Sequence, residues 1–126
     1  MNLLIVEDSP TMRRVIGNTV KKFMECDVTE AEHGIDALQV LKNKDIDLIL
    51  LDWMMPVMDG IEFITALRKM KKFKHHPVLM ITTKASKKEI ILAISSGVND
   101  FAVKPINAPV LEAKIKNVLY RNSKEN

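Results

Sequence analysis

Five short apolar runs, each followed by a segment with helical periodicity, constrain the fold of this chain more than any other feature. We predict strands over 2–6, 27–31, 47–52, 77–82 and 99–103, and helices over 10–24, 34–43, 60–71, 87–96 and 108–120. Repeated strand–helix units are typical of a mostly parallel sheet with helices on both faces. The runs at 3–6 and 48–51 are apolar throughout, as strands covered on both faces require. A length of 126 residues suits one α/β domain.

Capping signals at the predicted helix starts support these boundaries. The predicted caps are Ser9 followed by Pro10, the Asp59-x-x-Glu62 and Ser86-x-x-Glu89 capping boxes, and Asn107 before the last helix. Beyond the last helix the chain is polar. We therefore expect one domain over residues 1–121 and a short polar tail over 122–126.

Charge and composition argue against several classes of protein. The net charge is +3, but the lysines lie in small groups near predicted helix ends, and the chain has one Trp and one Tyr. We interpret them as solvated surface and expect no nucleic-acid partner. No apolar run is long enough to span a bilayer, and the first residues lack the pattern of a signal peptide. With Cys26 as the only cysteine, we expect a cytoplasmic protein that contacts no membrane.

Charged and hydroxyl side chains follow four of the predicted strands. In open parallel sheets, ligands bind outside the carboxyl ends of the strands. The residues at these ends are Glu7 and Asp8 after the first strand, Asp52 at the third, Thr82 at the fourth, and Lys104 after the fifth. If the first and third strands are neighbours, three carboxylates converge and cannot all stay ionised without cations. Lys104 can neutralise one of them, and Mg²⁺ suits the remainder.

This combination has a chemical meaning. An aspartate carboxylate can act as a nucleophile and accept a phosphoryl group, and a metal with a lysine can neutralise the phosphoryl oxygens. Thr82 can donate a hydrogen bond to a further oxygen. Taken singly, each residue has an ordinary explanation as a turn former, a helix-dipole partner or a strand end. Their joint occurrence, in this order, makes Asp52 the predicted phosphoacceptor.

Four segments carry a resemblance to a known family. "LLIVEDSPTMRR", "LILLDWMMPVMDG", "VLMITT" and "GVNDFAVKP" resemble response-regulator receiver domains, especially the single-domain type of chemotaxis systems. The resemblance runs from about residue 2 to 120. It implies a flavodoxin-like (βα)5 three-layer sandwich with a parallel sheet in the order 2-1-3-4-5. It also implies a cis peptide between Lys104 and Pro105.

The resemblance implies a role for each matching residue. Asp52 would accept a phosphoryl group from a CheA-like sensor histidine kinase. The implied metal set is Asp8 and Asp52 as direct Mg²⁺ ligands, Glu7 acting through water, and the backbone carbonyl of Met54. Lys104 would contact the phosphoryl group, while Thr82 and Phe101 would form the conformational switch.

Several positions depart from the family pattern. Glu7 replaces a shorter aspartate, and Phe101 replaces a tyrosine, so that no phenolic hydroxyl is available there. Met54 and Lys84 flank the site where polar or acidic residues often occur, and Ile106 replaces a phenylalanine. The helix over 87–96 is apolar around more than one face, so we expect an exposed partner surface with Ile90, Ile91, Phe101 and Ile106.

The expected function is a phosphorylation-switched signalling protein of a two-component system, in chemotaxis or flagellar motor control. It would be a monomer that binds a phosphorylation-dependent target such as a flagellar switch protein, and not an enzyme beyond phosphorylation and slow dephosphorylation at Asp52. One alternative is a phosphorelay intermediate that passes the group to another histidine domain. Another is a metal-dependent phosphatase with an aspartate nucleophile, but Met54 occupies the position where such enzymes carry a second acid.

Overall fold

The computed structural model describes residues 1–125, which form a five-stranded parallel sheet, five α-helices and one 3-10 turn. The strands are β1 (Asn2–Val6), β2 (Asp27–Ala31), β3 (Leu48–Leu51), β4 (Val78–Thr82) and β5 (Asp100–Val103). The helices are α1 (Pro10–Lys21), α2 (Gly34–Asn43), α3 (Gly60–Lys69), α4 (Lys87–Ser96) and α5 (Ala108–Glu125), with the 3-10 turn η1 at Lys71–Phe73. The strand order is β2-β1-β3-β4-β5, as the resemblance implied.

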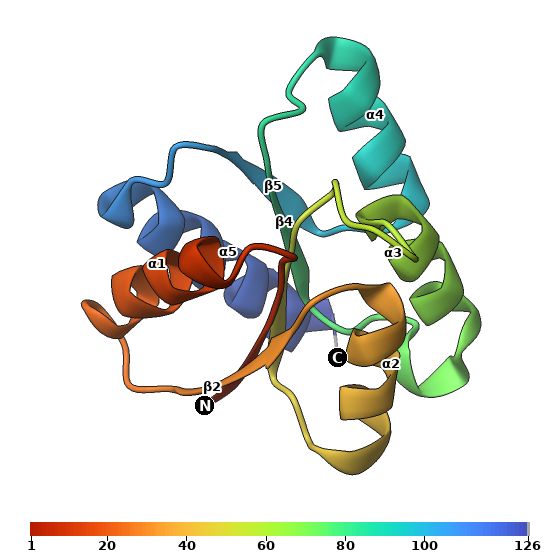
Figure 1. Cartoon of the computed structure of the whole chain (residues 1–126), viewed down its shortest axis with the longest axis horizontal. Coiled ribbons are helices and arrows are strands. Elements are labelled where there is room, and N and C mark those ends of the chain that lie inside the picture. The colour runs from red at the N-terminus through yellow and green to blue at the C-terminus, as the bar shows by residue number, and fades with distance from the viewer. Residues whose placement is uncertain (126) are drawn as a thin grey trace.

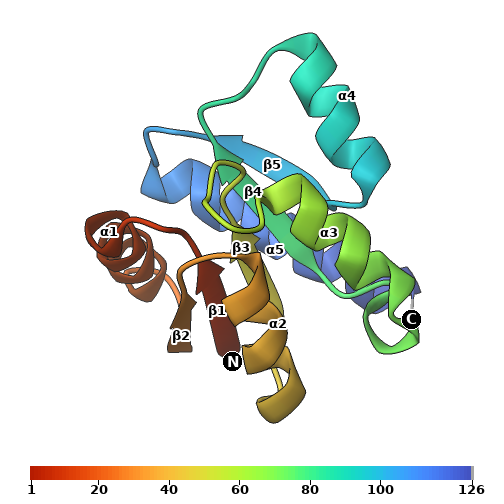
Figure 2. The ribbon, with the colours of Figure 1, turned by 45° about the vertical axis from the view of Figure 1, so that its right-hand side comes forward.

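The sheet lies between two layers of helices (Figures 1 and 2). Helices α1 and α5 cover one face, and α2, α3 and α4 cover the other. In β1, Leu3 and Ile5 pack toward α1 and α5, whereas Leu4 and Val6 pack toward the opposite layer. A strand buried on both faces has no solvated side that would select polar residues. This explains the continuous apolar runs, and the predicted three-layer α/β sandwich is confirmed.

The helix caps form as predicted. Ser9 Oγ accepts a hydrogen bond from Met12 N at 3.2 Å, and Asn107 Oδ1 accepts one from Val110 N at 3.2 Å. Both predicted capping boxes are present, at the starts of α3 and α4. The sequence analysis missed the cap of α2, where His33 Nδ1 accepts from Asp36 N.

Three helix ends differ from the prediction, and the smallest difference is in α3, which ends at Lys69 rather than residue 71. Helix α1 ends at Lys21 rather than residue 24, because Phe23 and Met24 leave the helical path and pack against the core. Helix α5 continues past residue 120 to Glu125, so the expected polar tail is helical over 122–125, and Asn126 lies outside the described residues. No Gly or Pro stands after residue 120 to stop the helix. Within residues 1–125, no helix combines the length and the apolar character that crossing a bilayer requires.

The strand register brings the predicted site residues to one edge of the sheet. Val6 of β1 pairs with Leu51 of β3, and Asp52 N donates to Val6 O at 2.9 Å. On the other side of β3, β4 ends at Thr82, which pairs with Val103. The residues that follow β1, β3 and β5 therefore leave the sheet at the same carboxyl edge.

Candidate functional site

Three carboxylates converge at the carboxyl edge of the sheet. Each of Glu7, Asp8 and Asp52 offers an oxygen within 4.8 Å of the other two. Glu7 and Asp52 are only 2% and 6% exposed, whereas Asp8 lies at the surface. The predicted convergence of these acids is confirmed, and the cluster opens toward solvent at Asp8.

Lys104 reaches this cluster from the end of β5. Its Nζ lies 2.7 Å from Glu7 Oε1 and 3.3 Å from Asp52 Oδ1. Burial alone would lower the pKa of Lys104, but the hydrogen bond to Glu7 and the charge of Asp52 outweigh it and raise the pKa above its ordinary value. The lysine is therefore a fixed positive charge between two acids. The peptide that joins it to Pro105 is cis, as predicted.

One lysine does not neutralise three carboxylates. The side-chain hydrogen bond with Glu7, followed by desolvation and the charge of Glu7, raises the pKa of Asp8 above its ordinary value. The charge of Glu7 raises this pKa more than the charge of Lys104 lowers it. A set of carboxylate oxygens open to water is a donor set suited to a hard divalent cation, and so the residues fit Mg²⁺.

Asp52 is held in a defined orientation. Its Oδ1 accepts a hydrogen bond from Trp53 N at 2.9 Å in addition to the contact with Lys104. Gly60 N donates to Trp53 O at 2.8 Å and holds the start of α3 against the loop. Glycine makes this close approach possible, because it has no Cβ to meet the loop backbone. The acid at the end of β3 is thus positioned by the backbone of the loop that follows it.

We expect Gly60→Ala to destabilise the fold. A Cβ atom at position 60 would clash with the backbone oxygen of Asp52 and lie 2.9 Å from Trp53 Cα, and backbone atoms cannot rotate away. Urea denaturation should show a loss of about 1–3 kcal/mol, as overpacking typically costs. Gly17→Ala is the matched control, because its Cβ would meet only side chains at 3.7 Å or more within a helix. That variant should gain about 0.5–1 kcal/mol; equal effects of the two changes would contradict this explanation.

Thr82 and its neighbours lie beside the acids. The Thr82 side chain is buried, and its Oγ1 accepts from Lys84 N at 3.0 Å. The Lys84 ammonium lies 3.2 Å from Glu89 Oε2 and 5.6 Å from the centre of the Trp53 ring. Met54, by contrast, points an apolar side chain into solvent and is 57% exposed. No acid stands at position 54, two residues after Asp52, to act as the general acid of a phosphatase.

The predicted switch residue, Phe101, lies between the hydrophobic core and a lysine of α5. Its half-buried ring packs against the core layer formed by α2, α3 and α4. Lys114 of α5 places its Nζ 5.0 Å from the ring centre, and the same Nζ lies 3.3 Å from Asp100 Oδ1. A cation over an aromatic face is attractive, so the ring has a polar contact even without a phenolic hydroxyl. Ile106 packs against the other core layer, but it lines a cavity of about 240 Å³ together with Phe101.

The expected exposure of α4 is confirmed, with a refinement. Ile91 is 58% exposed, and Leu92 and Ile94 are also exposed, whereas Ile90 is half-buried. Apolar side chains thus cover more of α4 than its contact with the sheet requires. Lys87 and Lys88 are exposed at the start of the same helix.

Sequence reasoning missed Arg13, which donates hydrogen bonds to the backbone at Glu7 and Asp8. The available signal was its place in the first turn of a helix that directly follows the acidic pair.

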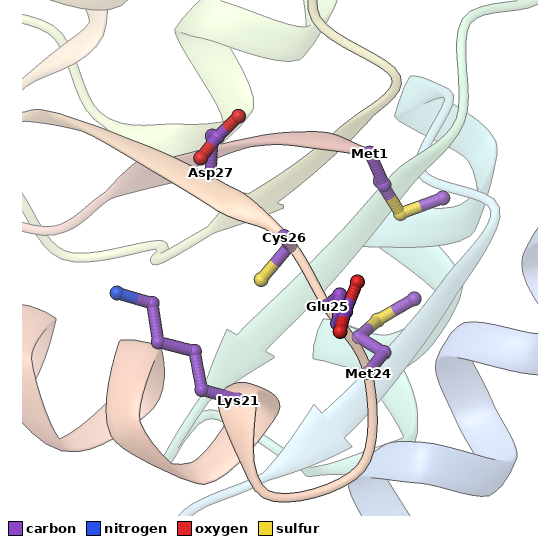
Figure 3. A pocket seen from close by; sticks show the side chains of 6 residues that line it. All are labelled: Met1, Lys21, Met24, Glu25, Cys26 and Asp27. Carbon is purple, nitrogen blue, oxygen red and sulfur yellow. The ribbon is translucent and has the colours of Figure 1, made fainter.

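A hollow at the opposite edge of the sheet is unrelated to these residues (Figure 3). It measures about 430 Å³ and is lined by Met1, Lys21, Met24, Glu25, Cys26 and Asp27. Burial raises the pKa of the Cys26 thiol, which makes its thiolate scarcer.

The fold and this edge define a class of protein: a doubly wound α/β domain whose strand ends gather an acidic cluster that could hold a metal, a lysine and a hydroxyl. The chain belongs to the response regulator receiver domain family, whose model matches residues 3–116. It is a phosphorylation-switched module of two-component signalling and not an enzyme in the ordinary sense.

Named relatives agree with this assignment. The "Chemotaxis protein CheY homolog" of Campylobacter jejuni is 44% identical, with 99% of this chain and 97% of that protein covered. The "Chemotaxis protein CheY1" of Helicobacter pylori is also 44% identical, over 97% of this chain and 99% of that protein. Among solved structures, the chemotaxis protein CheY4 of Vibrio cholerae matches with a TM-score of 0.85 and 32% identity, and 93% of this chain and 97% of that chain are covered. The phosphorelay and phosphatase alternatives are not favoured by these relatives.

Proposed function

We propose that Asp52 accepts a phosphoryl group from a phosphohistidine of a sensor kinase in a Mg²⁺-dependent step. The observation that carries this proposal is the contact of Lys104 Nζ with both Glu7 and Asp52, inside a cluster of three acids at the sheet edge. In the proposed metal set, Asp8 and Asp52 bind directly, Glu7 acts through water, and the Met54 carbonyl completes the protein ligands. The metal, when bound, supplies positive charge to the phosphoryl oxygens.

The chain's own residues account for the remaining chemistry. A carboxylate oxygen of Asp52 forms the new bond to phosphorus, while the bond from phosphorus to the imidazole nitrogen of the kinase breaks and the imidazole keeps the electron pair. Lys104 Nζ lies 3.3 Å from Asp52 Oδ1, so the attacking carboxylate is held beside a positive charge. The Lys104 ammonium group would then contact a negatively charged phosphoryl oxygen. The same site allows slow hydrolysis of the acyl phosphate by water.

The phosphoryl group would change the surface through Thr82 and Phe101. It adds roughly −1.5 to −2 charges at Asp52. The Thr82 hydroxyl, which accepts from Lys84 N at 3.0 Å without phosphate, would turn to donate to a phosphoryl oxygen. Phe101 would turn inward as Thr82 moves, and this would shift the population of the α4–β5–α5 surface.

The partner surface would comprise Ile90, Ile91, Phe101 and Ile106. The exposed apolar side chains of α4 support it, since contiguous apolar patches tend to mark interaction sites. Lys87 and Lys88 would form a basic rim for an acidic partner segment. Lys114 belongs to this rim but is already paired with Asp100. The names of the relatives support a role in chemotaxis. We further propose a cytoplasmic monomer that receives its phosphoryl group from a CheA-like kinase and binds a flagellar switch protein.

We expect Ile91→Ala to weaken target binding of the activated protein by about tenfold. Loss of a largely exposed isoleucine from an interface removes about 1.5 kcal/mol of apolar burial. Binding to the purified flagellar switch component should be measured with and without beryllofluoride, a phosphoryl mimic, and likewise for Ile90→Ala and Phe101→Ala. Ile35→Ala, an exposed isoleucine on α2, is the matched control and should bind as wild type does. If Ile90→Ala, Ile91→Ala and Phe101→Ala all keep the activated-state affinity, the partner surface lies elsewhere.

A further inference from the structure

One guanidinium group ties three segments together at the acidic edge. Arg13 Nη1 donates to the backbone oxygen of Glu7 at 2.7 Å and to that of Asp8 at 3.3 Å. Its Nε donates to Glu30 Oε1 at 2.6 Å. The side chain is only 11% exposed. Arg13 therefore links α1 and β2 to the loop that carries two of the three acids.

The two backbone oxygens that accept from Arg13 lie on either side of the Asp8 Cα atom in the chain. The oxygen of Glu7 belongs to the peptide that precedes Asp8, and the oxygen of Asp8 belongs to the peptide that follows it. Holding both peptide planes fixes the direction of the Cα–Cβ bond of Asp8, from which its carboxylate extends. Asp8 itself is exposed, so packing does not hold it.

The loop that follows β1 also holds carboxylates close together although like charges repel one another. The oxygens of Glu7, Asp8 and Asp52 lie within 4.8 Å of one another, while Lys104 contacts only Glu7 and Asp52. Without a tether, an exposed carboxylate next to two others would relax toward solvent. The other hydrogen bonds of this loop include Glu7 N to Ala31 O at 3.0 Å, Ser9 N to Glu7 Oε2 at 3.3 Å and Met12 N to Ser9 Oγ at 3.2 Å, and none of these three involves the backbone oxygen of Asp8.

We propose that Arg13 is a positioning residue for divalent metal binding, which holds Asp8 beside Asp52 before the metal arrives. This inference rests on the proposed Mg²⁺ site. The competing explanation is that the positive charge of Arg13 repels Mg²⁺, in which case removing that charge would tighten Mg²⁺ binding. Positioning and repulsion therefore predict changes of opposite sign.

The test is a Mg²⁺ titration of Arg13→Gln, followed by the fluorescence of Trp53, the single tryptophan and the neighbour of Asp52. We expect Mg²⁺ affinity to fall about tenfold or more, the usual effect of losing an outer partner of a metal ligand. Arg14→Gln is the matched control, because it removes the same charge from an adjacent, exposed residue with no side-chain hydrogen bond to this loop within residues 1–125. Circular dichroism should establish that both variants are folded.

Phosphorylation by a small phosphodonor adds a second readout. A residue that only positions the metal ligand should raise the Mg²⁺ concentration needed for half-maximal labelling of Asp52 and leave the rate at saturating Mg²⁺ close to that of wild type. Arg13→Lys keeps the charge but cannot reach two carbonyls and Glu30 with a planar fork, so it should restore little affinity. If Arg13→Gln does not fold, Glu30→Gln, which releases only the β2 end of the tether, should weaken Mg²⁺ binding by a smaller factor.

Unchanged or tighter Mg²⁺ binding in folded Arg13→Gln would overturn the inference, as would an equal loss in Arg14→Gln. With Glu30→Gln as the only folded variant, wild-type affinity would overturn it. A wild-type protein with no saturable Mg²⁺ response would instead refute the proposed metal site, and the inference with it.

Discussion

Asp52→Asn is expected to abolish phosphorylation by a small phosphodonor in the presence of Mg²⁺, with labelling reduced to background. A carboxamide lacks the anionic oxygen that attacks phosphorus. It is nearly isosteric, however, and its oxygen can still accept from Trp53 N and Lys104, which Asp52 Oδ1 contacts at 2.9 and 3.3 Å. The site should therefore keep its shape while losing its nucleophile. Intact-protein mass spectrometry would detect the addition of one phosphoryl group.

Asp45→Asn is the matched control for this experiment. Asp45 is exposed and lies three residues before the start of β3, at the opposite edge of the sheet. The same chemical change there should leave labelling at the wild-type level. Strong labelling of Asp52→Asn at another residue would show that the phosphoacceptor has been assigned wrongly.

Asp8→Ala is expected to lower Mg²⁺ affinity by at least about tenfold, because loss of a mere outer partner of a metal ligand already costs about 10–100-fold. Asp8 is the exposed acid of the cluster, and its oxygen lies within 4.8 Å of those of Glu7 and Asp52. Its own pKa is raised by the hydrogen bond with Glu7, by desolvation and by the charge of Glu7. A Mg²⁺ titration read by Trp53 fluorescence measures the change.

Glu7→Gln provides the comparison. Glu7 contacts Lys104 at 2.7 Å and would act on the metal through water, so this change should reduce Mg²⁺ affinity less than Asp8→Ala does. Wild-type affinity in Asp8→Ala, or a larger loss in Glu7→Gln, would reverse the assignment of direct and indirect ligands.

Much of the fold could be predicted from local pattern. The apolar run of β1 and the capping box of α3 each depend on residues close in sequence, and both were placed within a residue or two. The acids at the strand ends followed from the rule that parallel strands gather their carboxyl ends at one edge. The strand order, by contrast, came from family resemblance, because spacing alone does not say which strands pair.

The features that escaped prediction depend on contacts between distant segments. Phe23 and Met24 leave α1 because the core offers them more burial than another helical turn would. Lys114 lies over Phe101 because α5 packs beside β5, and no pattern within either segment records that neighbour.

The sequence by itself therefore determined which chemical groups stand at the strand ends, since strand and helix periods follow from the order of apolar and polar residues. Only the tertiary structure decided how those groups meet. The register of β1 against β3 sets Asp52 next to Glu7, Lys104 reaches Glu7 across 97 residues of chain, and Arg13 of α1 reaches Glu30 of β2. Each of these depends on a distance between segments that are far apart in the chain, and such distances are set only when the whole core packs.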